Sequence, residues 1–132
     1  VKRVLLCSGK VYYDLLERQR MDNRTDVAIV RIEQLYPIPH DQLKVIKSKY
    51  KKSTEFIWVQ EEPENMGAWP YMCRKFRGTE FNLEAISRKE SSSTATGYAK
   101  KHTIQQQYMV DKAFETAGKK NVSANQKVEQ AN

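Results

Sequence analysis

The chain has 132 residues, of which 39% are hydrophobic and 30% charged, as expected of one soluble globular domain with its own core. It holds no run of 18 apolar residues, which excludes an ordinary membrane-spanning helix. The net charge of +7 favours an anionic partner, but aromatic residues do not interleave with the lysines of residues 44–52 as they do in platforms for single-stranded nucleic acid.

The first part of the chain alternates between strand and helix patterns. Residues 4–7 form an apolar run that predicts a strand, and apolar residues at helical spacing follow between 11 and 20. Residues 27–32 predict a second buried strand. Because the chain starts directly in a strand pattern, without an initiator Met or a signal region, we expect it to be a piece of a longer protein.

The middle of the chain repeats this alternation. Two prolines hold residues 37–39 extended, and a helix is predicted to begin at 40–41. Residues 56–59 predict a third strand, which we expect Glu61, Glu62 and Pro63 to break. The sequence therefore continues the strand and helix alternation.

The last third predicts a helix, a strand and another helix. A third helix is expected over residues 66–76, with Asn65 as its N-cap and Pro70 in its first turn. A weaker strand is expected over 83–86, and a final amphipathic helix should open at His102 and run to 117. The predicted organisation is one domain over 1–118 and a flexible basic tail over 119–132.

Alternating strands and helices predict an α/β fold: a three-layer αβα sandwich around a mostly parallel sheet of four to five strands. The loops that leave the strands should then share the carboxyl edge of the sheet, where open α/β folds bind ligands. Cys7 and Cys73 are expected to be buried, reduced thiols, because no Cys-x-x-Cys or Cys/His cluster accompanies them.

One set of polar residues at this edge is a candidate site for an anionic effector. An arginine with nearby hydroxyls can clasp phosphate or carboxylate, and backbone amides at a helix start can help. Neither a dinucleotide-binding nor a Walker A glycine pattern is present, so a tight turn and a solvated loop remain the alternative interpretation. The candidate residues are Ser8, Gly9, Lys10, Arg88, Ser91 and Ser93.

A second set is predicted to contact another domain or subunit. Its carboxylates could also act as acid/base groups or cation ligands, but their spacing fixes no pair of them in a defined geometry. Neither His40 nor His102 has a nucleophile at a recognised spacing, so we predict no catalytic residue and no metal ligand. The predicted interface residues are Glu33, Gln34, Glu61, Glu62, Asn65 and Trp69.

Three segments carry a resemblance to a known family: GKVYYDL at 9–15, RIEQLYPIP at 31–39 and WVQEEPENMGAW at 58–69. Over about residues 1–117, the chain resembles the C-terminal domain of the thiamine-dependent decarboxylating component of 2-oxoglutarate dehydrogenase. It departs from that pattern at Ser87 and Lys89, which flank Arg88, at Thr94 and at Gln105.

The resemblance implies a transketolase C-terminal-like domain with a structural or regulatory role. In that superfamily thiamine diphosphate and Mg are bound by the preceding domains, and the third domain packs on them and supports a homodimer. The whole enzyme would belong to the tricarboxylic acid cycle, decarboxylating 2-oxoglutarate and passing the succinyl group to the lipoyl arm of a succinyltransferase component. The segment alone should be inactive.

The resemblance also implies a location: the cytoplasm of a bacterium or the mitochondrial matrix of a eukaryote, with no membrane partner. Two alternative functions stay open from the sequence. One is the same domain of another 2-oxoacid dehydrogenase or a transketolase-type enzyme. The other is a small basic nucleic-acid-binding module, for which no known signature is present.

Overall fold

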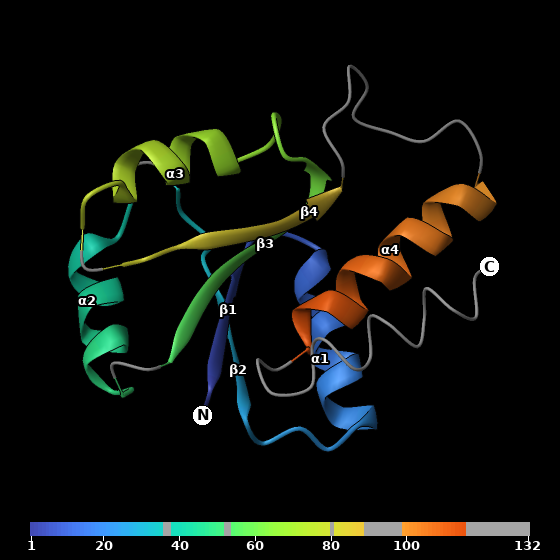
Figure 1. The fold of residues 1–132 in the computed structure, drawn as a ribbon, viewed down its shortest axis with the longest axis horizontal. Coiled ribbons are helices and arrows are strands. Elements are labelled where there is room, and N and C mark those ends of the chain that lie inside the picture. Colours follow the sequence, from blue (N-terminus) through green and yellow to red (C-terminus); the bar gives the residue numbers. More distant parts are fainter. Residues whose placement is uncertain (36–37, 52–53, 80, 89–98, 116–132) are drawn as a thin grey trace.

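The computed structural model describes residues 1–35, 38–51, 54–79, 81–88 and 99–115. Within these residues, four strands alternate with four helices (Figure 1). The elements are β1 (Arg3–Cys7), α1 (Val11–Met21), β2 (Val27–Arg31), α2 (His40–Ser48), β3 (Glu55–Pro63), α3 (Trp69–Phe76), β4 (Glu84–Arg88) and α4 (Ala99–Ala113). None of the helices in this described part is long and apolar enough to cross a membrane.

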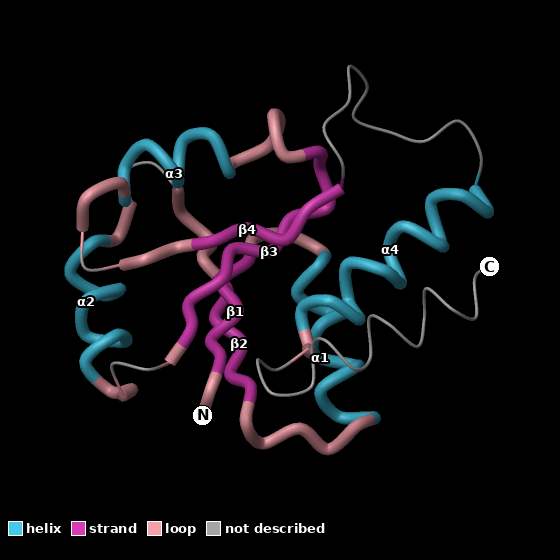
Figure 2. Tube along the Cα trace, viewed as in Figure 1, coloured by secondary structure: helices cyan, strands magenta, loops and turns pink. Residues whose placement is uncertain are grey.

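The four strands form one parallel sheet in the order β2-β1-β3-β4. β1 therefore lies inside the sheet, and its residues pair with β2 on one side and β3 on the other. Helices α1 and α4 cover one face of this sheet, whereas α2 and α3 cover the other (Figure 2). The predicted three-layer α/β architecture with a mostly parallel sheet is confirmed.

The alternation of side chains along the strands builds a core on each face. In β1, Leu5 and Cys7 pack against α1 and α4, while Val4 and Leu6 pack against α2 and α3. All four are at most 1% exposed. A strand that is covered on both faces explains why its sequence is a continuous apolar run rather than an alternating one.

One charged residue belongs to this core. Arg3 is only 4% exposed, and its Nε donates a hydrogen bond to Glu55 on β3 at 2.9 Å. Its Nη1 donates to the backbone carbonyls of Lys112 and Ala113 at 3.0 and 3.1 Å. A cation at the carbonyl end of a helix is stabilising, so Arg3 ties the start of β1 to the end of α4.

The structure corrects three sequence predictions. β3 continues through Glu61, Glu62 and Pro63, which were expected to break it, because Pro63 still pairs with Arg88 of β4 after a register shift. α3 begins only at Trp69, and Ala68 rather than Asn65 is its N-cap; Pro70 does lie in its first turn.

The last helix also differs from its predicted bounds. α4 begins at Ala99, three residues before His102, and it ends at Ala113. The cysteines are free as expected, although Cys73 is only half-buried. The predicted tail at 119–132 lies outside the described residues.

Candidate functional site

The carboxyl ends of the parallel strands meet at one edge of the sheet. After β1 the chain enters α1 on one face, and after β3 it enters α3 on the other face. The winding of the sheet thus reverses between β1 and β3, which are neighbours. Open α/β sheets form their ligand crevice at such a point, so a binding site is expected at this edge.

A buried amide lies at this edge. Gln60 of β3 is 3% exposed. Its Nε2 donates hydrogen bonds to the backbone carbonyls of Glu62, Pro63 and Met66 at 3.2, 2.9 and 2.8 Å. The side chain therefore serves as a template around which the chain folds as it leaves the strand.

The oxygen of the same amide is equally engaged. Its Oε1 accepts a hydrogen bond from the indole Nε1 of Trp58 and another from the backbone N–H of Trp69, both at 2.9 Å. Trp58 is itself 1% exposed, so its hydrogen bond ties the amide of Gln60 to the hydrophobic core. Residues 60–69, which we call the rim segment, are held in one shape by this single side chain.

A glycine allows this close folding. Gly67 has φ +66, a conformation that L side chains rarely adopt. A Cβ there would lie 2.9 Å from Oε2 of Glu62 and 3.2 Å from Oε1 of Gln60. The spacing of Trp58, Gln60, Gly67 and Trp69 in the segment WVQEEPENMGAW thus has one physical explanation, the packing of the chain around a buried amide.

The predicted interface residues of this segment lie around that template. Glu61 and Glu62 are partly exposed, Asn65 is exposed and Trp69 is partly buried. Glu61 also accepts a hydrogen bond from Nε2 of Gln106 on α4 at 2.9 Å. The acidic side chains of the rim segment are thus carried by a rigid backbone at the carboxyl edge.

The other predicted interface residues lie beyond the end of β2. Glu33 and Gln34 are exposed, and both line a groove of about 490 Å³ between β2 and α2. The floor of that groove includes Ile38 and Leu43. An exposed polar border around an apolar floor is typical of a surface that another protein segment covers.

The start of α1 carries the first half of the candidate anion site. Gly9 has φ +79, and the exposed Lys10 is the N-cap residue of α1 and makes no side-chain capping bond. Arg31, at the end of β2, pairs in register with Cys7, directly before this turn. Sequence reasoning assigned Arg31 to a buried strand and so missed it as a cation at this edge.

Aromatic rings hold that cation in place. The guanidinium of Arg31 lies 5.3 Å from the ring centroids of both Tyr12 and Tyr13. It also donates a hydrogen bond to the Tyr13 hydroxyl at 3.3 Å and lies 4.0 Å from Glu33. A cation on aromatic faces loses little freedom when it meets an anion, which suits a binding or docking role.

The second half of the candidate anion site is only partly described. Arg88 ends β4, and its backbone pairs with Pro63 at the carboxyl edge. Since β3 lies between β1 and β4, Arg88 is two strands away from Ser8 rather than beside it. The side chain of Arg88 and residues Ser91 and Ser93 lie outside the described part.

His40 and Cys7 lie in environments that indicate a structural role rather than a chemical one. The ring of His40 lies 5.4 Å from that of Phe76, at the start of α2. Burial raises the pKa of the Cys7 thiol to about 12, which keeps it protonated and unreactive. Among the described residues, no three His, Cys, Asp or Glu side chains gather as metal ligands.

Comparison with known proteins shows which family the chain resembles. The profile of the 2-oxoglutarate dehydrogenase C-terminal family matches residues 1–114. The 2-oxoglutarate dehydrogenase E1 component of Haemophilus influenzae is 48% identical over 117 residues, which cover 86% of this chain and 12% of the relative.

Two further relatives match the same portion. The E1/E2 component of Corynebacterium glutamicum is 42% identical over 118 residues, covering 87% of the chain and 10% of the relative. The E1 component of Azotobacter vinelandii is 42% identical over 120 residues, covering 86% and 13%. The chain therefore spans only about a tenth of the length of these relatives.

Proposed function

Because the chain belongs to the 2-oxoglutarate dehydrogenase C-terminal family, we propose that it is the structural and regulatory C-terminal domain of such an enzyme's decarboxylating component. The whole component would decarboxylate 2-oxoglutarate and pass the succinyl group to a lipoyl group. The observation that carries this proposal is Gln60, whose amide bonds fix the rim segment at the end of β3, on the carboxyl edge of the sheet. The edge is thus shaped to be covered by another domain.

Thiamine diphosphate and Mg belong, in this proposal, to the domains that precede the chain. The described part of the chain does not fit that group, because no three of its His, Cys, Asp or Glu side chains gather as metal ligands. The proposed contribution of this chain is therefore to dock on the upstream domains and to orient them. Its proposed partners are the upstream domains, a second copy of the enzyme and the lipoyl succinyltransferase component.

The cytoplasm is the proposed location, since these three relatives are bacterial. Neither a membrane nor a nucleic acid is a proposed partner. Lys47 lies over the rings of Phe56 and Phe81 at 4.7 and 5.3 Å, so part of the lysine-rich surface packs on the protein itself. That arrangement favours a solvated helix face over a nucleic-acid platform.

Activity measurements test this proposal. The chain alone should not consume 2-oxoglutarate, whereas the upstream domains should require it for full turnover with thiamine diphosphate and Mg. Turnover by the isolated chain, or equal turnover by the upstream domains without it, would overturn the proposal. Faster turnover of pyruvate or a branched-chain 2-oxoacid would assign the chain to another 2-oxoacid dehydrogenase.

An anionic effector, a nucleotide or an acyl-CoA, is proposed to bind at the start of α1. The support is the turn at Gly9, the exposed Lys10 and the adjacent Arg31. Calorimetry with AMP and acetyl-CoA should give heat that Arg31→Ala reduces at least fivefold, while the remote Arg74→Ala leaves it unchanged. Equal binding heat for Arg31→Ala and Arg74→Ala would contradict effector binding at the start of α1, and it would leave the family assignment unaffected.

A further inference from the structure

The positive charge of the chain is concentrated in one layer of the fold. Helices α2 and α3 cover the same face of the sheet (Figure 2), and we call them the α2–α3 layer. The segments 38–52 and 69–80, which contain these helices, hold eight lysines and arginines but only two acidic residues, whereas the other 105 residues hold 15 and 14. A surface with this charge balance attracts anionic partners.

Six cations of this layer are exposed. Within the described residues none of the six joins an ion pair, because the ion pairs of the structure lie in other elements. Two of them, Arg74 and Lys75, lie 5.9 and 5.6 Å from the ring centroid of Tyr71 instead. Their charges therefore remain for a partner from outside. The six are Lys44, Lys49, Lys51, Arg74, Lys75 and Arg77.

A cavity of about 390 Å³ opens in the α2–α3 layer, where residues from the start of α2 and the end of α3 line it together. Its apolar lining is Phe76 and Phe81, whose ring centroids are 5.2 Å apart at an interplanar angle of 60°. Both residues are at most 5% exposed, so their rings form a recessed floor. The exposed His40 and Lys44 line the cavity from α2.

The polar groups that remain for a ligand in this cavity are on α2. The hydroxyl of Thr79, the fifth lining residue, donates to the carbonyl of Phe76 at 2.7 Å and accepts from the backbone N–H of Phe81 at 3.3 Å. It is thus engaged within the protein, which leaves the ammonium of Lys44 and the imidazole of His40. Because an ammonium only donates, the cavity suits a group with an apolar body beside an anion.

An aromatic side chain flanked by carboxylates has both properties. Its ring can meet Phe76 and Phe81 in the tilted geometries that aromatic pairs prefer. Its neighbouring carboxylates can meet Lys44 and also Arg77, since Arg77 lines an adjoining cavity that shares Phe76, Phe81 and Thr79. An aromatic anchor in a pocket is typical of the centre of a protein interface.

A nucleic acid suits the same surface less well. Bases stack on exposed ring faces. Phe76 and Phe81 are recessed instead, and Lys47 already lies over Phe81, 5.3 Å from its ring centroid. A ring on a flexible side-chain stem can enter such a recess, so the observations favour a polypeptide.

We propose that the α2–α3 layer binds an acidic segment of another polypeptide, which places an aromatic side chain in the cavity above Phe76 and Phe81. The exposed cations of the layer attract the segment, and Lys44 and Arg77 pair with the carboxylates beside the ring. The rim segment carries carboxylates of its own, so the α2–α3 layer is a separate surface with a different preference. This proposal does not depend on the reaction that the whole enzyme catalyses.

Amide NMR titration of the 132-residue chain tests it. The probe is the capped peptide Asp-Glu-Phe-Asp-Glu. One matched peptide carries alanine in place of phenylalanine, and another carries asparagine and glutamine in place of the acids. The probe should saturate shifts at residues 40, 44, 76 and 79 below about 5 mM, and each matched peptide should bind at least fivefold more weakly. Raising the salt from about 25 to 250 mM should weaken the probe at least threefold, because the cations are exposed.

Two variants of the chain test the role of the cavity. Lys44→Gln should weaken binding of the probe at least threefold. The matched control is Arg20→Gln, which removes one positive charge from an exposed position on α1, on the other face of the sheet, and should leave binding unchanged.

Five results would overturn the proposal. They are no saturation by the probe, equal binding of the peptide without the ring, shifts that map away from the cavity, identical affinity of Lys44→Gln and the unsubstituted chain, and tighter binding of a thymidine pentanucleotide. The pentanucleotide has the same four negative charges as the probe, so its tighter binding would assign the layer to nucleic acid. Should Lys44→Gln fail to fold, the peptides and the pentanucleotide decide the matter with the unsubstituted chain alone.

Discussion

The backbone N–H of Trp69 donates a hydrogen bond to the side-chain oxygen of Gln60 at 2.9 Å. The two residues are nine positions apart, at either end of the rim segment. This one contact closes the segment into a rigid feature at the carboxyl edge of the sheet. It explains both the local sequence pattern and the outward placement of the acidic side chains.

Replacing Gln60 by Leu should lower the free energy of unfolding by about 3 kcal/mol, because it leaves several buried backbone groups without partners. Urea denaturation measures this change. The matched control is Gln42→Ala, an exposed glutamine on α2, which should change stability by no more than about 0.5 kcal/mol. Equal, small effects of both substitutions would show that the Gln60 bonds do not organise the segment.

Gly67→Ala should be more destabilising than Gly78→Ala. Both glycines have positive φ, +66 and +74, so both substitutions cost about 1 kcal/mol for the backbone alone. Only at Gly67 does the new Cβ meet side-chain atoms of Glu62 and Gln60, whereas nothing lies within 4 Å of it at Gly78. The midpoint temperature of thermal unfolding should be lower for Gly67→Ala than for Gly78→Ala. The opposite order would contradict the close packing around Gly67.

Arg3→Met should loosen the end of α4. The substitution keeps the buried stem but removes the donors to the carbonyls of Lys112 and Ala113 and leaves Glu55 without its partner. We expect a loss of about 3 kcal/mol. Hydrogen exchange should quicken in the last turn of α4 well beyond that in α2, and the exposed Arg20→Met is the control. Uniform quickening throughout the chain would argue against a local tie.

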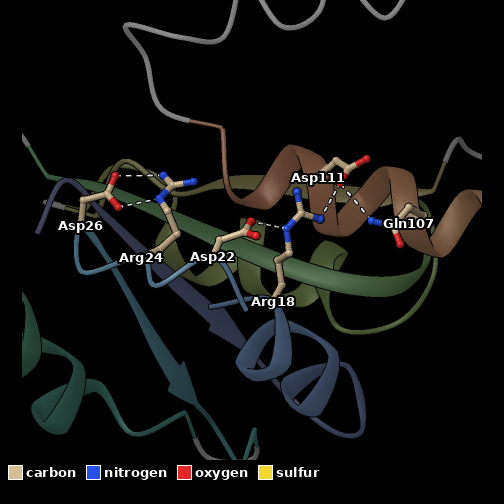
Figure 3. A network of polar contacts seen from close by, with 6 residues as sticks. All are labelled: Arg18, Asp22, Arg24, Asp26, Gln107 and Asp111. Carbon is tan, nitrogen blue, oxygen red and sulfur yellow. Dashed lines mark hydrogen bonds and ion pairs between the residues drawn. The ribbon is translucent and has the colours of Figure 1, made fainter. Parts of the chain in front are cut away.

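The carboxyl of Asp26 should titrate at unusually low pH. Arg24 donates two hydrogen bonds to it, at 2.7 and 2.9 Å, and these bonds lower its pKa from 3.8 to about 2 (Figure 3). Because the folded pKa is the lower one, this ion pair stabilises the fold above about pH 4, and the contribution disappears as the pH falls toward 2. The side chain of Asp26 is 31% exposed, so solvent screening keeps the stabilisation small.

Carbon NMR of the side-chain carboxyl measures this titration. Arg24→Met should return the Asp26 pKa to near 3.8, and Arg20→Met should leave it near 2. An Asp26 pKa near 4 in the unsubstituted chain would show that the ion pair does not persist in solution.

The order of strands and helices could be predicted from the sequence, because apolar runs such as residues 4–7 and helical stripes such as that of α1 are local signals. The end of β3 at Pro63 could not be predicted from the sequence. Gln60 and Glu61 were expected to lie near a strand break because they are polar, yet loop carbonyls and Gln106 satisfy them within the fold. The loop carbonyls are near Gln60 in sequence but meet its side chain only after the chain has folded around it. Gln106 lies far along the chain from Glu61, so a local sequence pattern reveals neither partner.

The positions of the candidate interface residues could be predicted in part, while their contact with another domain stays a prediction. The sequence assigned the interface to Glu61, Glu62, Asn65 and Trp69, and the structure collects these residues in one rim segment. The start of α3 was placed too early, because Asn65 is a good N-cap by residue type while the chain around it is bound to Gln60. Arg3 and Arg31 gave no signal, since a charged residue at a strand end usually points to solvent.

Chemical labelling of carboxylates tests most directly whether the rim segment is a docking surface. Carbodiimide coupling should modify Glu62 and Glu64 readily in the 132-residue chain, and at least fivefold more slowly in the whole decarboxylating component. Glu84, at the opposite end of β4 from this edge, is the internal control and should react equally in both. Equal labelling of these two rim carboxylates in both forms would contradict the account.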